Sequence, residues 1–211
     1  IAARLNTEGG ILVYNPLGFA RKGIVRFAGA TAELTEEVPA FGWGVARSMI
    51  RQAAVTVDGL TVENQYYVLT LDHSGRIRSL FDKAANRHVL KPGTFGNELQ
   101  VFEDFPRQYD NWEISDYYKQ KMWVLEDAAA IQPVQDGSRA GFRIQKTYMH
   151  SAIIQTLWLY SESRRIDFET EIDWHEHHQI LKTAFPLDVL ANTATYDIQF
   201  GHVQRPTHEN T

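Results

Sequence analysis

Alternating apolar and polar positions are the strongest pattern along this chain. Between residues 165 and 174, charged side chains alternate with apolar ones such as Ile166 and Phe168. Side chains of a β-strand point to its two faces in turn, whereas a helix would spread both sets around one cylinder. The pattern therefore predicts a half-buried strand whose acidic row, from Asp167 to Asp173, faces solvent.

Shorter stretches of the same kind predict further strands. They cover residues 11–14, 23–27, 42–46, 66–71, 76–81, 141–149, 152–160, 180–189 and 195–200, with a weaker strand near Ile131. Segments 72–75 and 136–137 carry the Asp and Gly residues of hairpin loops. Pro186 lacks an amide donor, so it predicts an edge strand or a bulge. No segment has convincing helical spacing and no βαβ order is visible, which predicts an all-β, antiparallel fold.

Strand length divides the chain into two parts. Residues 1–50 contain short strands and the turn at 15–18, whereas the strands after Met49 are longer. We therefore predict a small β-unit at 1–50 and a large antiparallel domain at 51–211. No repeat of roughly 20–50 residues is visible, which disfavours a propeller or a solenoid.

Composition excludes several classes of function. Apolar residues make up 44% of the chain and charged residues 22%, as is usual for a globular protein. The net charge of −5 offers no basic field for phosphate backbones, so no nucleic-acid partner is expected. No apolar run approaches the ~20 residues of a membrane helix, so no membrane partner is expected either. The absence of cysteine excludes disulfides and thiolate metal sites, and it fits a reducing, cytoplasmic compartment.

The segment 102–118 is the strongest candidate for a functional loop. It holds five acids and six aromatic residues, and it shows no strand alternation of its own. Aromatic faces pack on sugar rings while carboxylates bind the hydroxyls, so the loop could line a carbohydrate site. The alternative is a loop that buries its aromatic rings on the sandwich. A glycosidase pair of acids within it also stays open, because such a pair is defined by separation, which sequence does not give.

Two histidine-containing segments deserve the same comparison of alternatives. His175 and His177 would share one strand face and could bind zinc, but the alternation ends there, which favours a hairpin turn. The polar segment 201–211 is typical of a frayed terminus. The chain also starts at Ile1 without methionine and stops as though a strand were missing, so we expect both ends to be cut.

Several short motifs occur in an order that resembles a known family. They are Tyr14 to Leu17, Glu63 to Tyr67, Gly75 to Lys83, Gly96 to Gln100, the loop Tyr109 to Ile114, Asp173 to Glu176, and the run GHVQRPTHENT at 201–211. Together they resemble the C-terminal β-region of the glycoside hydrolase family 38 α-mannosidases, nearest to the bacterial and cytosolic type. The last run is the most specific of the set, and the resemblance covers essentially the whole chain.

The resemblance implies a fold, an activity and the domain that carries out the catalysis. The implied fold is a small β-sandwich followed by a large antiparallel supersandwich of the galactose-mutarotase-like type. The implied activity is that of a retaining exo-α-mannosidase, whose zinc and aspartate nucleophile belong to an N-terminal α/β barrel. Neither can be assigned to a residue of this chain, so we expect no catalytic residue, no metal ligand and no cofactor here. The implied partners are an α-mannoside and the barrel of the same polypeptide, and homo-oligomerisation stays open.

The resemblance also suggests substrate-binding residues. The family's loop reads roughly Tyr-Asp-Ala-Trp-Asp-Ile-Asp; Tyr109, Asp110, Trp112 and Ile114 match it, whereas Asn111, Glu113 and Ser115 depart from it. Because this loop is expected to approach the mouth of the barrel, Tyr109, Asp110, Trp112 and Glu113 are candidate substrate-binding residues. His202 and Arg205 match the motif of the tail, where the role is either substrate binding or structural. A free-standing carbohydrate-binding or structural β-module remains the alternative to an enzyme part.

Overall fold

The fold is built from antiparallel β-sheets. The computed structural model describes residues 10–27, 30–34, 36–47, 55–109 and 112–208. The first sheet has the order β1-β4-β3-β2 and consists of β1 (Ile11–Tyr14), β2 (Ile24–Phe27), β3 (Ala30–Leu34) and β4 (Trp43–Arg47). The second has the order β5-β6-β7-β8-β9 and consists of β5 (Thr56–Asp58), β6 (Thr61–Glu63), β7 (Tyr67–Leu71), β8 (Ile77–Asp82) and β9 (Arg87–His88).

Three further sheets complete the described part of the chain. The order β12-β13-β14-β15 joins β12 (Ala130–Asp136), β13 (Arg139–Tyr148), β14 (Ser151–Tyr160) and β15 (Ile166–Asp173). The order β11-β10-β16 joins β10 (Glu98–Glu103), β11 (Met122–Val124) and β16 (Gln179–Ala184), and a hairpin joins β17 (Thr193–Ile198) to β18 (Gly201–Pro206). Among the described residues the only helix is the short 3-10 helix η2 (Asp116–Gln120), so these sheets confirm the all-β prediction.

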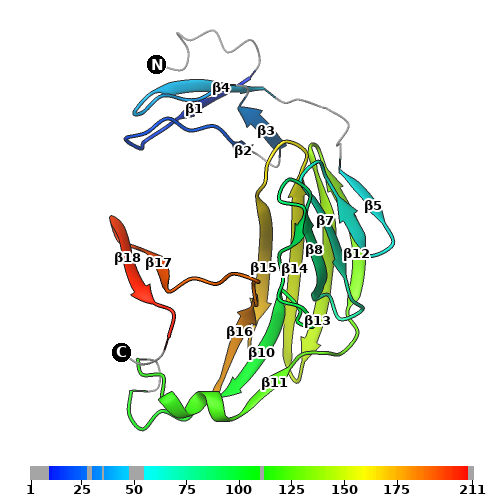
Figure 1. Ribbon diagram of the computed structural model, residues 1–211, viewed down its shortest axis with the longest axis vertical. Coiled ribbons are helices and arrows are strands. Elements are labelled where there is room, and N and C mark those ends of the chain that lie inside the picture. Colours follow the sequence, from blue (N-terminus) through cyan, green and yellow to red (C-terminus); the bar gives the residue numbers. More distant parts are fainter. Residues whose placement is uncertain (1–9, 28–29, 35, 48–54, 110–111, 209–211) are drawn as a thin grey trace.

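The main core lies between the β5–β9 sheet and the β12–β15 sheet (Figure 1). Leu69 and Ile77 of the β5–β9 sheet and Phe142 and Leu157 of the β12–β15 sheet are at most 1% exposed. On β13 the inward residues recur at every second position, because a strand points alternate side chains to the same face. These two layers form an all-β sandwich. That it is a supersandwich of the galactose-mutarotase-like type stays a prediction.

One strand, β14, serves a second core as well. Its inward residue Ile153 packs with Leu99 and Val101 of β10, while Leu157 packs in the main core. Between the two cores, the amide of buried Gln155 accepts a hydrogen bond of 2.5 Å from Asn97 Nδ2. Buried polar groups are tolerated inside a fold when they are hydrogen-bonded to each other. This bond therefore marks the seam, the place where the two sheets that pack on one face of β14 meet.

The first sheet has its own small core, formed by Leu34, Val38 and Ala46. In Figure 1 it lies beyond one end of the sandwich, and Arg26 of β2 reaches across to β14 and β15. Residues 48–54, which contain the predicted boundary between residues 50 and 51, lie outside the described part of the chain. The division into 1–50 and 51–211 therefore stays a prediction.

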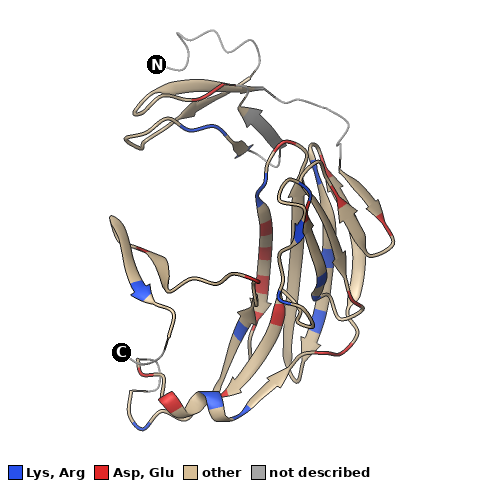
Figure 2. Ribbon diagram, in the orientation of Figure 1, with Lys and Arg blue, Asp and Glu red and all other residues tan. Residues whose placement is uncertain are grey.

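Three expectations from the sequence are wrong in detail. The predicted strand 180–189 ends at Ala184, two residues before Pro186. The alternative of a frayed tail is wrong over residues 201–206, because they form β18. Its mostly polar residues show no apolar–polar alternation that would predict a strand. The acidic row of β15 is not simply solvated. Figure 2 shows the acidic residues along β15, and two of them, Asp167 and Glu169, form ion pairs with Arg26 of the first sheet.

Candidate functional site

The loop that follows β10 is fixed at its base by the turn that follows β15. The amide of Asp104 donates a hydrogen bond of 2.8 Å to the carbonyl of His178. The ring of Phe105 stacks on the His178 imidazole with 4.5 Å between centroids and 19° between planes. At the other end of the loop, Lys182 of β16 donates a 2.8 Å hydrogen bond to the Tyr118 hydroxyl. The loop therefore leaves the sandwich from two anchored ends.

The described part of the loop tip is a tight turn that exposes its aromatic rings. The carbonyl of Tyr109 accepts hydrogen bonds from the amides of Trp112 at 2.6 Å and Glu113 at 3.0 Å. Tyr109 has a φ of 56°, in the left-handed region that few bulky residues adopt. Tyr109 is 70% exposed and Trp112 is 88% exposed. The interpretation in which the loop buries its aromatic residues on the sandwich is therefore wrong for these two rings.

The structure thus brings together three of the four loop residues predicted to bind substrate. Tyr109, Trp112 and Glu113 share one turn, and the Glu113 side chain is exposed with them. Asp110 and Asn111 lie outside the described residues, so the role of Asp110 stays a prediction. The exposed rings and a carboxylate on one turn provide stacking surface and hydrogen-bond acceptors, the two contacts that bind a sugar.

The other two predicted residues, His202 and Arg205, lie on the second strand of the β17–β18 hairpin. In the register, His202 is opposite Asp197 and Arg205 is opposite Ala194, and both are exposed. Thr207 closes the base of the hairpin through its amide to Asn192 O at 3.1 Å and its hydroxyl to Ala191 O at 2.7 Å. His202 and Arg205 are therefore held by strand pairing.

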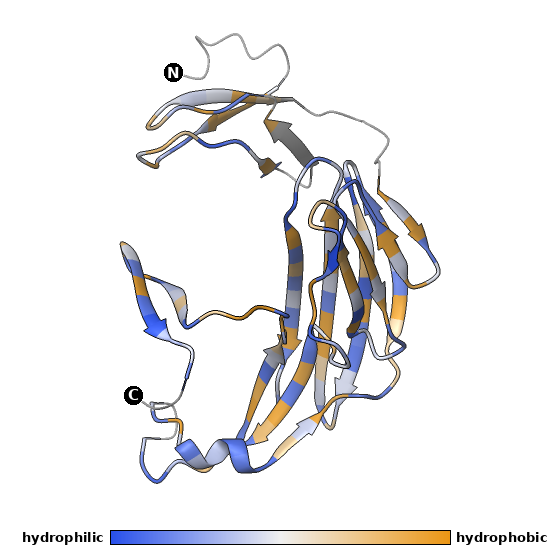
Figure 3. Ribbon diagram, in the orientation of Figure 1, coloured by the Kyte–Doolittle hydropathy of each residue, from blue (hydrophilic) through white to orange (hydrophobic). Residues whose placement is uncertain are grey.

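The hairpin and its connection are unusually apolar for an exposed element. Figure 3 shows apolar residues along the segment that leads from β16 to β17. The most exposed large apolar residues of this region are Leu187, Val189, Leu190, Tyr196, Ile198 and Phe200, with Leu190 and Phe200 fully exposed. In Figure 1 the hairpin and the 104–115 loop project to the same side of the sandwich. Large exposed apolar side chains gathered on one element are typical of a contact with another part of a protein or with a ligand.

The histidine cluster connects β15 to β16, which belong to different sheets, so the predicted hairpin turn is wrong. Two of its side chains have partners. His175 Nε2 lies 3.0 Å from Asp173 Oδ1, and Glu176 accepts hydrogen bonds of 2.8 Å from His150 N and Ser151 Oγ. Within the residues that the structure describes, no three His, Asp or Glu side chains meet in a group that could hold a metal ion. The zinc that the family resemblance implies is assigned by that resemblance to the N-terminal barrel and to no residue of this cluster. The described residues also include no helix long and apolar enough to cross a membrane.

Sequence reasoning missed the residues that position the loop. Phe105 and His178 are far apart along the chain, as are Tyr118 and Lys182, and no local pattern reports such pairs. Only the pairing of the neighbouring strands could have indicated these contacts. Phe105 and His178 meet because β10 pairs with β16; β16 largely coincides with the predicted strand 180–189, whereas β10 was not among the predicted strands.

Fold and site together define the class of this protein as an all-β sandwich that carries an exposed aromatic loop and an apolar hairpin. The particular family follows from comparison with known proteins. Residues 62–211 match the model described as the glycosyl hydrolases family 38 C-terminal domain. The chain belongs to glycoside hydrolase family 38, which confirms the resemblance stated above.

Curated relatives support the same assignment. Alpha-mannosidase 2C1 of Homo sapiens is 33% identical over 220 residues, which cover 96% of this chain and 21% of that protein. Alpha-mannosidase G of Dictyostelium discoideum is 34% identical over 160 residues, covering 72% of this chain and 14% of the relative. An alpha-mannosidase of Saccharomyces cerevisiae is 23% identical over 124 residues, or 54% of this chain and 11% of the relative. The chain therefore spans about a fifth or less of the length of these relatives.

Proposed function

We propose that this chain is the C-terminal β-region of a retaining exo-α-mannosidase and helps to shape its active site. The observation that carries the proposal is the match of residues 62–211 to the family 38 C-terminal domain, together with relatives named as alpha-mannosidases. The substrate is then an α-mannoside. The catalytic nucleophile and the zinc belong to an N-terminal barrel of the same polypeptide, as the family resemblance implies.

In this proposal the 104–115 loop and the β17–β18 hairpin face the barrel. Trp112 and Tyr109 are exposed, which leaves their rings available for a sugar or for the barrel surface. Glu113 and Asp110 accept hydrogen bonds from hydroxyls, while His202 and Arg205 act from the hairpin. The cytoplasm is the proposed compartment, which the absence of cysteine supports.

The test compares the whole protein with the 211-residue chain on an aryl α-mannoside. We expect turnover by the whole protein and none above buffer by the chain alone, because the chain lacks the proposed nucleophile. Turnover by the chain that is lost on replacing Glu113 would place the chemistry in the loop and overturn the proposal.

A carbohydrate-binding module without an active site is the second candidate, and the exposure of Trp112 favours it. Calorimetric titration of the chain with manno-oligosaccharides separates the two. A binding module binds them on its own, and Trp112→Ala abolishes the binding. A part of an enzyme site binds them weakly or not at all, because the barrel supplies most of the contacts.

A further inference from the structure

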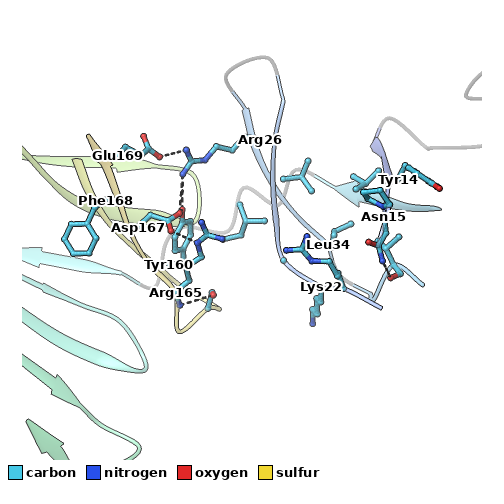
Figure 4. A pocket seen from close by; sticks show the side chains of 18 residues that line it. Tyr14, Asn15, Lys22, Arg26, Leu34, Tyr160, Arg165, Asp167, Phe168 and Glu169 are labelled. Atoms are coloured by element: carbon cyan, nitrogen blue, oxygen red, sulfur yellow. Dashed lines mark hydrogen bonds and ion pairs between the residues drawn. The ribbon is translucent and has the colours of Figure 1, made fainter. Parts of the chain in front are cut away.

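A pocket lies between the first sheet and the edge of the sandwich (Figure 4). The first sheet is at the opposite end of the molecule from the 104–115 loop (Figure 1). Its volume is about 520 Å³, within the range of ~300–1,000 Å³ typical of small-molecule sites. One wall comes from β1, β2 and the segment between them, and the other comes from β14, β15 and the segment that joins them. None of its lining residues belongs to the 104–115 loop or to the β17–β18 hairpin.

The polar side chains of the sandwich wall are joined by hydrogen bonds and ion pairs. The Tyr160 hydroxyl donates to Asp167 Oδ2 at 2.5 Å and accepts from Arg26 Nη2 at 3.1 Å. Arg26 also pairs with Glu169, and Arg165 pairs with Asp167. Burial and the hydrogen bond to Asp167 raise the pKa of Tyr160, so the phenol stays protonated at neutral pH. Arg26 reaches in from β2 on the opposite wall, and Glu169 also pairs with Arg139 at 2.8 Å, so both carboxylates already have cationic partners.

The opposite wall carries cations that have no such partners. Arg21 and Lys22 precede β2, and both side chains are exposed. Arg21 bonds to Val38 only through its backbone, with distances of 2.9 and 2.7 Å. Within the described residues, neither the Arg21 nor the Lys22 side chain has a hydrogen bond or an ion pair. Figure 4 shows Lys22 across the pocket from Tyr160 and Arg165.

The pocket is therefore positive on a protein that is negative overall. Four cations and two carboxylates are among the residues that line it, a surplus of two positive charges, while the chain as a whole carries −5. Such a local reversal of sign concentrates anions. An arginine beside a lysine suits a phosphate group, because the guanidinium binds two oxygens at once and the ammonium adds a point charge.

The remaining lining suits the rest of a small polyol. The partly buried Val13 and Val25 give an apolar surface, which can pack on the C–H face of a sugar ring. Asp167 and Glu169 present carboxylate oxygens, which accept hydrogen bonds from hydroxyls. We propose that this pocket binds a phosphorylated monosaccharide, with the phosphate held by Arg21 and Lys22 and the hydroxyls directed to Asp167 and Glu169. The proposal goes beyond the α-mannosidase function and does not depend on it.

Isothermal titration calorimetry of the purified protein tests this, in phosphate-free buffer, with mannose 6-phosphate, free mannose and inorganic phosphate as separate ligands. We expect mannose 6-phosphate to bind at least about tenfold more tightly than either of the other two, because it engages both halves of the pocket. The double variant Arg21→Ala/Lys22→Ala is expected to weaken that binding at least about tenfold, the loss of one charge-assisted hydrogen bond or more.

The matched control is Arg78→Ala/Lys91→Ala, which removes an exposed arginine and an exposed lysine outside the pocket lining. It changes the net charge equally and should leave the affinity within about twofold. Equal affinity for inorganic phosphate and mannose 6-phosphate would reduce the pocket to a simple anion site and overturn the sugar part of the proposal. No binding, or equal losses in both double variants, would overturn the site altogether. Activity on α-mannosides is not measured, so none of these outcomes decides the proposed function.

Discussion

The exposed ring of Trp112 allows a sharp test of the proposed role of the loop. We predict that Trp112→Ala in the whole protein lowers kcat/KM on an aryl α-mannoside and leaves the free energy of unfolding nearly unchanged. In the described structure Trp112 is 88% exposed, so its truncation removes little buried surface. Exposed substitutions of this kind change stability by less than about 0.5 kcal/mol.

The size of the effect follows from the area that the ring can cover. If one face of the indole packs on a sugar, roughly 70 Å² of apolar surface leaves water, which is worth about 1.8 kcal/mol at ~25 cal/mol per Å². Because ~1.4 kcal/mol is a factor of ten, kcat/KM should fall about twentyfold. Trp112→Tyr retains a flat ring and should recover most of that loss.

Steady-state kinetics and urea unfolding on the same samples give both quantities. Phe19→Ala is the matched control, since Phe19 is 62% exposed and lies in the connection between β1 and β2; it should change neither measurement. An unchanged kcat/KM in Trp112→Ala refutes the substrate contact. A loss of activity that comes with a large loss of stability shows instead that Trp112 is buried against another part of the whole protein.

Three further predictions concern the chain itself. Gly141→Ala should destabilise it by several kcal/mol in urea unfolding, because the added Cβ would lie 1.8 Å from Leu157 O, while Gly201→Ala, with open space around it, should be nearly neutral. Burial lowers the pKa of Lys146 below 10.5, so the unfolded chain holds the proton more tightly and stability should rise as pH is raised towards 10.5; Lys146→Met should lose this rise, and an identical pH profile would contradict it. In hydrogen exchange of the isolated chain, the loop amides at 105–109 and 112–115 should exchange faster than those of β13 and β14, and equal protection would show that the loop is packed on the sandwich.

The strands of the sandwich were largely predictable, because burial of one strand face requires an apolar residue at every second position of the sequence. β14 and β15 follow that pattern within one or two residues of the predicted bounds. β18 was not predictable, since both its faces are polar or exposed and burial imposes no pattern on it. Nor was the pairing of Arg26 with Glu169, because the residues that approach an acidic row depend on how two sheets pack.

The candidate site was predictable in its residue types but not in its geometry. The composition of 102–118 indicated a functional loop, and the family resemblance singled out Trp112 within it. Whether the rings were exposed or buried depended on contacts that no local pattern reports, such as the stacking of Phe105 on His178. The predicted substrate contacts themselves stay predictions.

The way β14 is shared between two cores has a consequence for cooperativity. Ile153 and Leu157 lie on one face of β14 but belong to different cores. If either core opens, part of the β14 surface that packs in the other core is exposed as well. The Asn97–Gln155 hydrogen bond crosses the seam and would be broken by either opening. The β5–β9 and β11-β10-β16 sheets should therefore unfold as one thermodynamic unit, and a cavity cut into either core should lower the protection of both to the same extent.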